Sequence, residues 1–319
     1  MIKRHVLSTE ATNGILIRRA AERPQYLALR STPKEFHPRR EPSQESRKTM
    51  LLAIDVGNSN TVLGLYQLTG DAAELVADWR ITTPVNQTAS ECGIVLQNLF
   101  SLNHLEMSVV TGVVISSVVP PLDPILRQVC ELYFHHKPLF IEPGVKTGLP
   151  ILTDNPAEVG ADRIVNCVAA HELYGRAGHS SATPIIVVDM GTATTFDVIS
   201  KKGEFLGGAI APGLRISADA LFSRAARLPR VDIKRPAKVI GTNTVDNMQI
   251  GLYYGYIGLV DGILARMIAE LGPDTKVVAT GGLSKLIAAG SQYLTTVDDM
   301  LTLTGLRIIY QRNQPHRKR

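Results

Sequence analysis

One pattern of acidic, glycine and hydroxyl residues occurs twice in this chain, each time between two apolar segments. Residues 51–66 read LLAIDVGNSNTVLGLY and align without a gap with residues 185–200, IIVVDMGTATTFDVIS. The alignment pairs Asp55 with Asp189, and in both copies a glycine follows the acid two positions later. Each copy predicts a strand that ends in the acid, a glycine turn and a second strand. A single copy could equally be an ordinary β-turn with a capping Asp, but two copies in register favour a duplicated unit.

The chemistry available in such a turn is the binding of phosphate and of a hard cation. Gly57 permits close approach of the backbone to a ligand, and successive N–H groups of the turn form a concavity for an anion. Asp55 can hold Mg²⁺ directly or through water, because this ion prefers oxygen ligands and usually keeps its own waters. The turn ThrGlyGly at 280–282 leaves backbone space for a flat base or a ribose. The sequence contains no GxxxxGK[ST] motif and no kinase glycine-rich loop, which disfavours other common phosphate-binding scaffolds.

Two kinds of apolar segment are expected to position these turns. Short β-rich runs predict strands at 51–55, 61–66, 113–119, 185–189, 196–200 and 277–280. Apolar residues at helical spacing predict helices over 90–102, 123–134, 161–175 and 248–271. Strands mixed with long amphipathic helices indicate an α/β architecture, and the duplication predicts two similar lobes that face each other across a cleft.

Charge separates the two ends of the chain from its middle. Residues 1–49 carry 11 Lys/Arg and 5 Asp/Glu with little strand or helix periodicity, and the last nine residues carry four basic residues and no acid. We therefore expect a flexible N-terminal extension at 1–49, an N-terminal lobe at 50–172, a C-terminal lobe at 173–310 and a basic tail at 311–319. The whole chain has a net charge of +5, so its middle is acidic, which argues against a nucleic-acid-binding core.

The composition argues against two further classes of protein. The longest apolar stretches, such as residues 109–119, are far shorter than the roughly 20 residues that span a bilayer, so no membrane-spanning segment is expected. Cys92, Cys130 and Cys167 stand far apart without a CxxC motif, which argues against a disulfide framework and a zinc site. Separate thiols are typical of a reducing cytoplasm, where we expect this protein.

Six motifs in order along the chain resemble those of type III pantothenate kinase, a family of the acetate kinase, sugar kinase, Hsp70 and actin superfamily. They are DVGNSNTV (55–62), GADRI (160–164), DMGTATTFDV (189–198), GGAIAPG (207–213), IGTNTVDNMQIG (240–251) and ATGGLS (279–284). The resemblance implies two duplicated ribonuclease H-like lobes, as in actin-like ATPases, with a nucleotide cleft between them. It implies transfer of the γ-phosphate of ATP to the primary hydroxyl of pantothenate, which gives 4′-phosphopantothenate at the start of coenzyme A biosynthesis. It further implies Mg²⁺, a monovalent cation (K⁺ or NH₄⁺) and a homodimer.

The resemblance also implies a role for each matching residue. Asp162 would accept the proton of the pantothenate hydroxyl, Asp189 would coordinate the monovalent cation, and Asp55 would lie nearest Mg²⁺. Thr192 would contact ATP, and Thr244 would contact pantothenate near the partner subunit. The ATP-binding turn would consist of Asp55, Val56, Gly57, Asn58, Ser59, Asn60, Thr61 and Val62, and the pantothenate pocket would be lined by Gly160, Ala161, Asp162 and Arg163.

General chemistry supports the roles given to Asp162 and Arg163. An alcohol nucleophile gains from a carboxylate that accepts its proton, and a guanidinium can bind the pantothenate carboxylate through two hydrogen bonds. Without the resemblance, a helix N-terminal acid beside a surface arginine would be the simpler interpretation. The chain departs from the family at Thr153, where members often carry an aromatic residue that contacts the substrate. We therefore expect the pocket wall to be built differently at this position.

Two other functions fit the same duplicated turns. Another phosphotransferase or phosphatase of the superfamily, such as a sugar or acetate kinase, would use the phosphate site with a different substrate, whereas the GADR motif favours pantothenate. A non-enzymatic, nucleotide-bound regulator would have lost the acids, yet Asp55, Asp162 and Asp189 are all present. A phosphate-transfer assay across candidate acceptors would separate these functions.

Overall fold

The computed structural model describes residues 49–70, 72–175 and 182–315, all of which lie in the unit Ser46–Arg319. The expected N-terminal extension, apart from its last residue, and the last four residues of the expected basic tail lie outside the described residues. Among the described residues, no helix combines the length and the apolar character that crossing a membrane requires.

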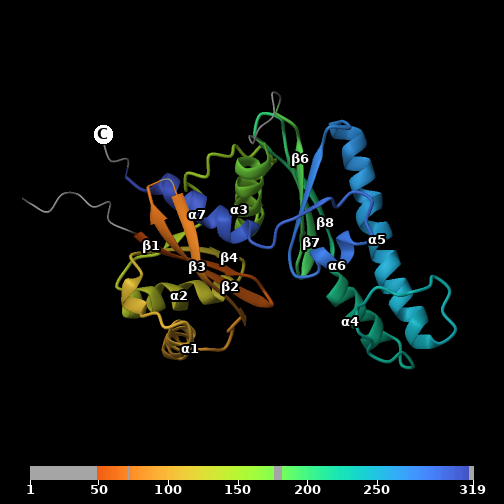
Figure 1. Ribbon diagram of the computed structural model, residues 1–319, viewed down its shortest axis with the longest axis horizontal. Helices are drawn as coiled ribbons and strands as arrows, with labels where there is room; N and C mark the ends of the chain where they lie inside the picture. The colour runs from red at the N-terminus through yellow and green to blue at the C-terminus, as the bar shows by residue number, and fades with distance from the viewer. Residues whose placement is uncertain (1–48, 71, 176–181, 316–319) are drawn as a thin grey trace, which may run out of the picture. The chain divides into compact units, whose positions relative to one another are not determined.

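Five strands form the first sheet (Figure 1). The antiparallel strands β1 (Thr49–Val56), β2 (Asn60–Thr69) and β3 (Ala72–Thr82) are joined on the other side of β1 by the parallel strands β4 (Gly112–Ser117) and β5 (Leu139–Phe140). The strand order is β3-β2-β1-β4-β5. The run predicted at 51–55 is thus the centre of the sheet, and its apolar side chains are buried because both faces of the sheet are covered.

The second sheet repeats this arrangement strand for strand. The antiparallel strands are β6 (Ile185–Met190), β7 (Ala193–Ile199) and β8 (Phe205–Pro212), and the parallel strands are β9 (Lys276–Thr280) and β10 (Thr296–Val297). The order β10-β9-β6-β7-β8 makes β6 the equivalent of β1 and β9 the equivalent of β4. The fold is therefore α/β with two duplicated ribonuclease H-like lobes of the actin-like type, which confirms the predicted duplication.

Helices follow the predicted segments closely and add several that the sequence pattern did not indicate. The predicted helix at 248–271 begins earlier, at Thr244, because the Asn243 side chain accepts the N–H of Asp246 at 2.9 Å and caps the helix. The helices at 123–134 and 161–175 each end in a wider π-helical turn, at Cys130–Phe134 and His171–Gly175. The α-helices are α1 (Ala89–Leu102), α2 (Asp123–Val129), α3 (Ala161–Ala170), α4 (Leu214–Arg224), α5 (Thr244–Leu271), α6 (Ser284–Ala288) and α7 (Leu301–Asn313), and short 3₁₀ turns lie at Met107–Val109, Pro120–Leu122 and Pro156–Glu158.

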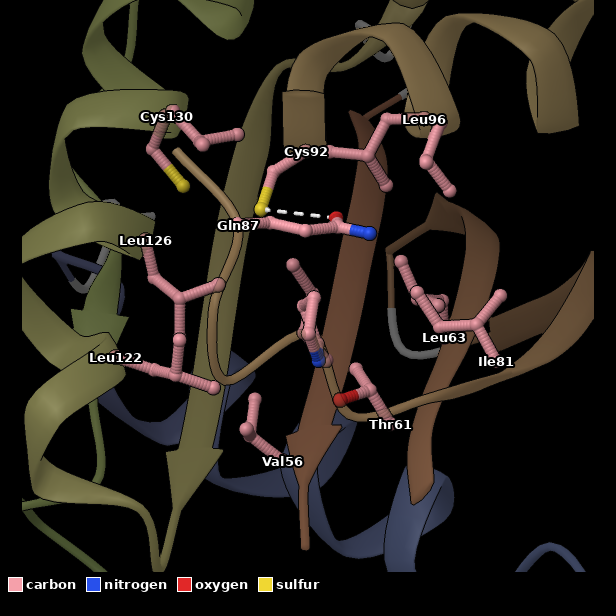
Figure 2. A pocket seen from close by; sticks show the side chains of 14 residues that line it. Val56, Thr61, Leu63, Ile81, Gln87, Cys92, Leu96, Leu122, Leu126 and Cys130 are labelled. Carbon is pink, nitrogen blue, oxygen red and sulfur yellow. Dashed lines mark hydrogen bonds between the residues drawn. The ribbon is translucent and has the colours of Figure 1, made fainter. Parts of the chain in front are cut away.

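Helices α1 and α2 cover one face of the first sheet (Figure 1). The Trp79 ring of β3 stacks on Phe100 of α1, with 5.1 Å between the ring centroids. A small apolar cavity of about 30 Å³ lies between this sheet and the two helices (Figure 2). Val56 and Thr61 line the cavity and also belong to the first glycine turn, so that turn rests on a packed apolar layer.

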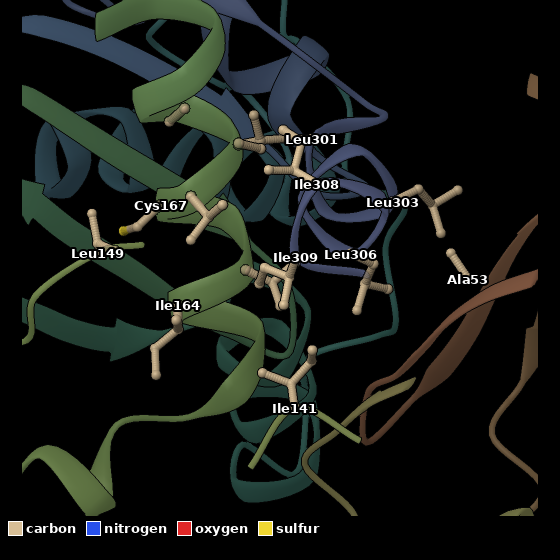
Figure 3. Packing of buried hydrophobic residues seen from close by; sticks show 14 of the residues in the cluster. Ala53, Ile141, Leu149, Ile164, Cys167, Leu301, Leu303, Leu306, Ile308 and Ile309 are labelled. Carbon is tan, nitrogen blue, oxygen red and sulfur yellow. The ribbon is translucent and has the colours of Figure 1, made fainter. Parts of the chain in front are cut away.

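Helices α3 and α7 pack against each other and against both sheets (Figure 3). One core cluster contains Leu51 of the first sheet and Phe205 of the second, together with residues of α3 and α7. A Cβ added at Gly305 of α7 would lie 2.1 Å from the carbonyl oxygen of Val165 in α3. Only a glycine permits this approach of the two helices. Because α3 also carries Asp162, this contact helps to set the position of a candidate catalytic group.

Gly305→Ala should therefore destabilise the protein. The added methyl group meets backbone, which cannot rotate away, and overpacking of this kind costs about 1–3 kcal/mol of unfolding free energy. Gly258→Ala in α5 is the matched control, because a Cβ there meets no atom within 4 Å. That control should be neutral or stabilising by up to about 1 kcal/mol, through helix propensity. Urea unfolding of both variants tests this, and equal stability of Gly305→Ala and the unchanged protein would contradict the packing argument.

Candidate active site

Asp55 and Asp189 occupy equivalent places near the ends of the central strands of the two sheets. Asp55 in β1 lies between β2 and Ser116 of β4, and Asp189 in β6 lies between β7 and Thr280 of β9. In both lobes the parallel neighbour presents a buried hydroxyl residue at this level. The repeat seen in the sequence is thus a repeat in space, with one acid from each lobe.

In both lobes the glycine that follows the acid closes its turn with a backbone hydrogen bond, to the third residue after it in the first lobe and to the second in the other. The N–H of Gly57 donates to the carbonyl oxygen of Asn60 at 3.0 Å, and the N–H of Gly191 donates to the carbonyl oxygen of Ala193 at 3.0 Å. The first turn is further fixed by the Thr83 hydroxyl, which donates to the Gly57 carbonyl. Both turns are therefore narrow, with their short polar side chains outside the sheet.

The two turns touch each other. The hydroxyl oxygens of Ser59 and Thr192, one from each turn, lie 2.9 Å apart at hydrogen-bond distance. The second turn is supported from behind by Gly213, whose N–H donates to the Thr192 carbonyl at 3.1 Å. A Cβ at Gly213 would lie 2.2 Å from that same oxygen, which explains the last glycine of the GGAIAPG motif. The two acid-bearing turns thus border one shared site.

Three carboxyl groups in this site influence one another. Burial, together with the charges of Asp162 and Asp189, raises the pKa of Asp55 from 3.8 to about 7. Burial, together with the charge of Asp162, likewise raises the pKa of Asp189 to about 7. The neighbouring Ser116 hydroxyl lowers the pKa of Asp55, the Asn166 amide lowers that of Asp189, and the charge of Arg80 lowers both. A site with this excess of acidic groups is suited to binding cations.

These raised pKa values predict how stability depends on pH. Between the ordinary pKa of 3.8 and the folded-state pKa of about 7, the folded protein binds more protons at Asp55 and Asp189 than the unfolded chain does. The two groups should therefore lower the unfolding free energy as pH rises through this range in the absence of added divalent cations. Urea unfolding of the double variant Asp55→Asn, Asp189→Asn should show a weaker fall with pH. An identical pH dependence of the two proteins would contradict this electrostatic picture.

The ThrGlyGly turn after β9 lies directly against Asp189. Gly281 has a φ of +92°, and a Cβ there would lie 2.7 Å from Oδ1 of Asp189 and from the Met190 backbone. Both the positive φ and the close approach require glycine. The space at Gly281 that the sequence suggested for a base or a ribose is thus occupied by the Asp189 carboxylate.

Asp162 lies in the first turn of α3, where its carboxylate folds back over the start of the helix. The N–H of Arg163 donates to Oδ1 of Asp162 at 2.8 Å. A Cβ at Gly160 would lie 2.7 Å from that oxygen, so the glycine of the GADR motif leaves room for the carboxylate. Burial raises the pKa of Asp162, although the hydrogen bond and charge of Arg163 lower it. The group is therefore a stronger proton acceptor than an exposed aspartate would be.

Arg163 is held by an acid that the sequence analysis did not single out. Its Nε donates to Oδ1 of Asp197 in β7 at 2.7 Å, and the two side chains form an ion pair. Asp197 is fully buried, and its other oxygen accepts the Thr195 hydroxyl at 3.0 Å. Arg163 is thus anchored at the site rather than lying on the surface. The available signal was an acid within the apolar run FDVI.

Asn166 is a second residue that the sequence analysis missed. It is buried one helical turn after Asp162, and its Nδ2 donates to Oδ2 of Asp189 at 3.0 Å. The Thr302 hydroxyl of α7 donates to Oδ1 of Asn166 at 2.7 Å. This chain of hydrogen bonds ties α3 and α7 to the end of β6. A polar amide on the apolar face of the predicted helix was the signal that could have identified it.

Two other residues from the sequence analysis have less direct links to the acids. Thr244 is the exposed first residue of α5, and no hydrogen bond within the described ranges joins it to Asp55, Asp162 or Asp189. Thr153 lies beside β8, where its methyl group would be 3.7 Å from a Cβ at Gly207. Its buried hydroxyl has no hydrogen-bond partner among the residues that the structure describes.

The carboxylates of the site suit a cation that is bound jointly by the protein and by a substrate. In the part of the chain that the structure describes, no group of three or more His, Cys, Asp and Glu side chains could hold a metal ion. Asp55 and Asp189 each offer one carboxylate beside polar turns. Mg²⁺ is usually bound in this way, by one or two carboxylates, its own waters and substrate phosphates.

A site of this kind, with acids at the ends of equivalent strands in duplicated lobes, is typical of phosphotransferases of the actin-like superfamily. A family model described as type III pantothenate kinase matches residues 51–266. A type III pantothenate kinase of Koribacter versatilis (strain Ellin345) is 59% identical over 276 residues, which cover 85% of this chain and 98% of that protein. A type III pantothenate kinase of Myxococcus xanthus (strain DK1622) is 56% identical over 264 residues, covering 83% and 99% of the two chains. The chain belongs to the type III pantothenate kinase family.

Proposed function

We propose that this protein transfers the terminal phosphoryl group of ATP to the primary hydroxyl of pantothenate, which gives 4′-phosphopantothenate in the first step of coenzyme A biosynthesis. The observation that carries the proposal is the meeting of Asp55, Asp162 and Asp189, from three separate elements, beside two touching glycine turns. Membership of the family supports pantothenate as the acceptor over a sugar or acetate. The presence of all three acids supports an enzyme over a non-enzymatic regulator.

The nucleotide phosphates are proposed to bind along the first turn, residues 55–62, with Thr192 contacting them from the second lobe. Backbone N–H groups and short hydroxyl side chains suit phosphate oxygens. Asp55 is proposed to hold Mg²⁺ directly or through water. When bound, Mg²⁺ supplies neutralisation of phosphate charge, which phosphoryl transfer requires more than covalent chemistry. Burial raises the pKa of Asp55, and binding of the ion would favour its ionised form.

The acceptor is proposed to lie at the start of α3, lined by Gly160, Ala161, Asp162 and Arg163. Asp162 accepts the proton of the primary hydroxyl as that oxygen attacks the phosphorus atom. Arg163 has Nε and Nη2 directed at Asp197 and therefore offers Nη1 to the pantothenate carboxylate. The buried ion pair fixes the guanidinium, so the substrate meets a preorganised cation.

Asp189 is proposed to bind the monovalent cation, K⁺ or NH₄⁺. Its Oδ2 accepts the Asn166 amide, which fixes the plane of the carboxylate and leaves Oδ1 for a cation. Such an ion would offset the repulsion between the three carboxylates and the phosphates.

A homodimer in the cytoplasm is the proposed working form. Val239 and Ile240, just before α5, are 65% and 84% exposed, which is unusual for large apolar side chains. A second copy that covers this region would bring Thr244 of one subunit towards the pantothenate site of its partner. The acidic middle of the chain supports small-molecule substrates rather than nucleic acid.

Phosphate transfer by the purified full chain tests the proposal. ADP release should require pantothenate together with ATP and Mg²⁺, should be faster in K⁺ or NH₄⁺ than in Na⁺, and should be absent with acetate or sugars as acceptors. The same rate in Na⁺ would remove the cation assignment at Asp189. Release with another acceptor and not with pantothenate would replace the proposed function by that of a related phosphotransferase, and release with none would favour a regulator.

A further inference from the structure

Arg80 carries a positive charge into the shared site from the edge strand of the first sheet. It lies in β3, where its backbone pairs with Val62 near the start of β2. Its Nη1 would be 3.8 Å from a Cβ placed at Gly282. Gly282 follows Gly281, which packs against Asp189. The Arg80 guanidinium therefore lies beside the ThrGlyGly turn of the second lobe, although its backbone belongs to the first.

The charge of Arg80 acts on acids of both lobes. Burial is the main cause of the raised pKa values of Asp55 and Asp189, and the charge of Arg80 lowers both values. Arg163, the other cationic group of the site, is bound to the buried Asp197. The Arg80 side chain, by contrast, forms neither a hydrogen bond nor an ion pair with any residue that the structure describes. Its planar set of donors is thus available to a ligand.

The charge balance of the site indicates what this ligand is. Three carboxylates and a bound triphosphate would place many negative charges together, and the transferred phosphoryl group needs them offset as it moves. A guanidinium can donate two parallel hydrogen bonds to two oxygens of one phosphate group. A hydrated cation at a single carboxylate does not provide this pair of bonds. Arg80 stands beside the ThrGlyGly turn that packs against Asp189, and its backbone pairs with Val62, in the strand that follows the turn after Asp55.

We propose that Arg80 binds the terminal phosphate of the nucleotide and stabilises it during transfer. This inference rests on the proposed function and extends it, because it adds a catalytic residue outside the six motifs. It commits Arg80 to the γ-phosphate, so its loss should affect ATP and spare ADP. If Arg80 only shielded the two acids, or contacted the base, its loss would not weaken ATP binding selectively over ADP binding.

Arg80→Met and Arg80→Lys test the proposal in the full-length protein. Arg80→Met keeps the apolar stem and removes the guanidinium, so kcat should fall by about 10²–10³-fold, as after loss of other transition-state donors. The KM for pantothenate should change little. Arg80→Lys should recover part of the lost rate, because it restores the charge without the planar pair of donors. Arg127→Met is the matched control: Arg127 is half-exposed, pairs with Glu142 and is not among the charges that act on Asp55 or Asp189.

Nucleotide binding, measured by calorimetry with a non-hydrolysable ATP analogue, ADP and adenosine, gives a readout independent of turnover. Arg80→Met should weaken binding of the ATP analogue by about tenfold or more and leave ADP and adenosine within about twofold, which are the changes expected for a lost charge-assisted contact to one phosphate. Equal weakening of all three ligands, or a kcat within about twofold of the unchanged protein, would overturn the proposal. If the unchanged protein binds these nucleotides but does not phosphorylate pantothenate, the proposed function fails while the binding result still decides the role of Arg80.

Discussion

Asp162→Asn is expected to lower kcat by about 10²–10⁴-fold, the range found for loss of a general base. The asparagine side chain has the same shape and can still accept the N–H of Arg163, so α3 should keep its start. It cannot accept a proton from the attacking hydroxyl. Binding of ATP and the oligomeric state should be unchanged, and steady-state kinetics with calorimetry of ATP binding would measure both properties. Asp162→Ala should lose turnover to a similar extent.

The pH profile adds an independent check on Asp162. Since only the carboxylate form accepts a proton, the rate should rise with pH through the pKa of this group. Burial raises that pKa, so the rising part of the profile should lie at higher pH than for an exposed aspartate. Asp154→Asn, at an exposed position before α3, is a control that should keep both rate and profile. A near-normal kcat for Asp162→Asn would remove the general-base assignment.

Asp55→Asn is expected to reduce kcat/KM for ATP by about 10²–10³-fold, because it removes the carboxylate proposed to hold Mg²⁺ against the phosphates. Higher Mg²⁺ concentration should recover part of the activity, since the phosphates still bind the ion. Rates measured across a Mg²⁺ titration would show both effects.

The stability of Asp55→Asn should not fall with its activity, and it should stay the same or rise. The Asp55 carboxylate is buried near two other acids, and its pKa is raised to about 7. A neutral amide at this position removes that repulsion, so the variant should unfold at the same or a higher urea concentration than the unchanged protein at about pH 8. A strongly destabilised Asp55→Asn variant, or one with unchanged ATP kinetics, would mean that the acid has a structural role instead.

The duplicated turns could be predicted because their signal is local. An apolar run, an acid, a glycine and a second apolar run specify strand, turn and strand within 16 residues, and both copies formed the expected pair of strands. The elements that were missed have weaker local patterns. β3 (Ala72–Thr82) is mostly exposed, β8 (Phe205–Pro212) contains two adjacent glycines, and α7 (Leu301–Asn313) is buried on most sides and so lacks a clear amphipathic pattern.

The missed residues of the site share a different cause. Asp197, Asn166 and Arg80 act through partners or neighbours that are distant in the sequence, so no spacing rule relates them. Asn166 binds Asp189 across 23 positions, and Arg163 binds Asp197 across 34. These pairings exist only after α3 has packed between the two sheets. The sequence could supply the acids, whereas the fold was needed to show what orients them.

A crystal structure with a non-hydrolysable ATP analogue, pantothenate, Mg²⁺ and K⁺ would test the central claim most directly. The terminal phosphate should lie between the turns that carry Asp55 and Asp189, with the primary hydroxyl of pantothenate within about 3.2 Å of the Asp162 carboxylate. A nucleotide bound away from either turn, or a pantothenate hydroxyl remote from Asp162, would contradict the account.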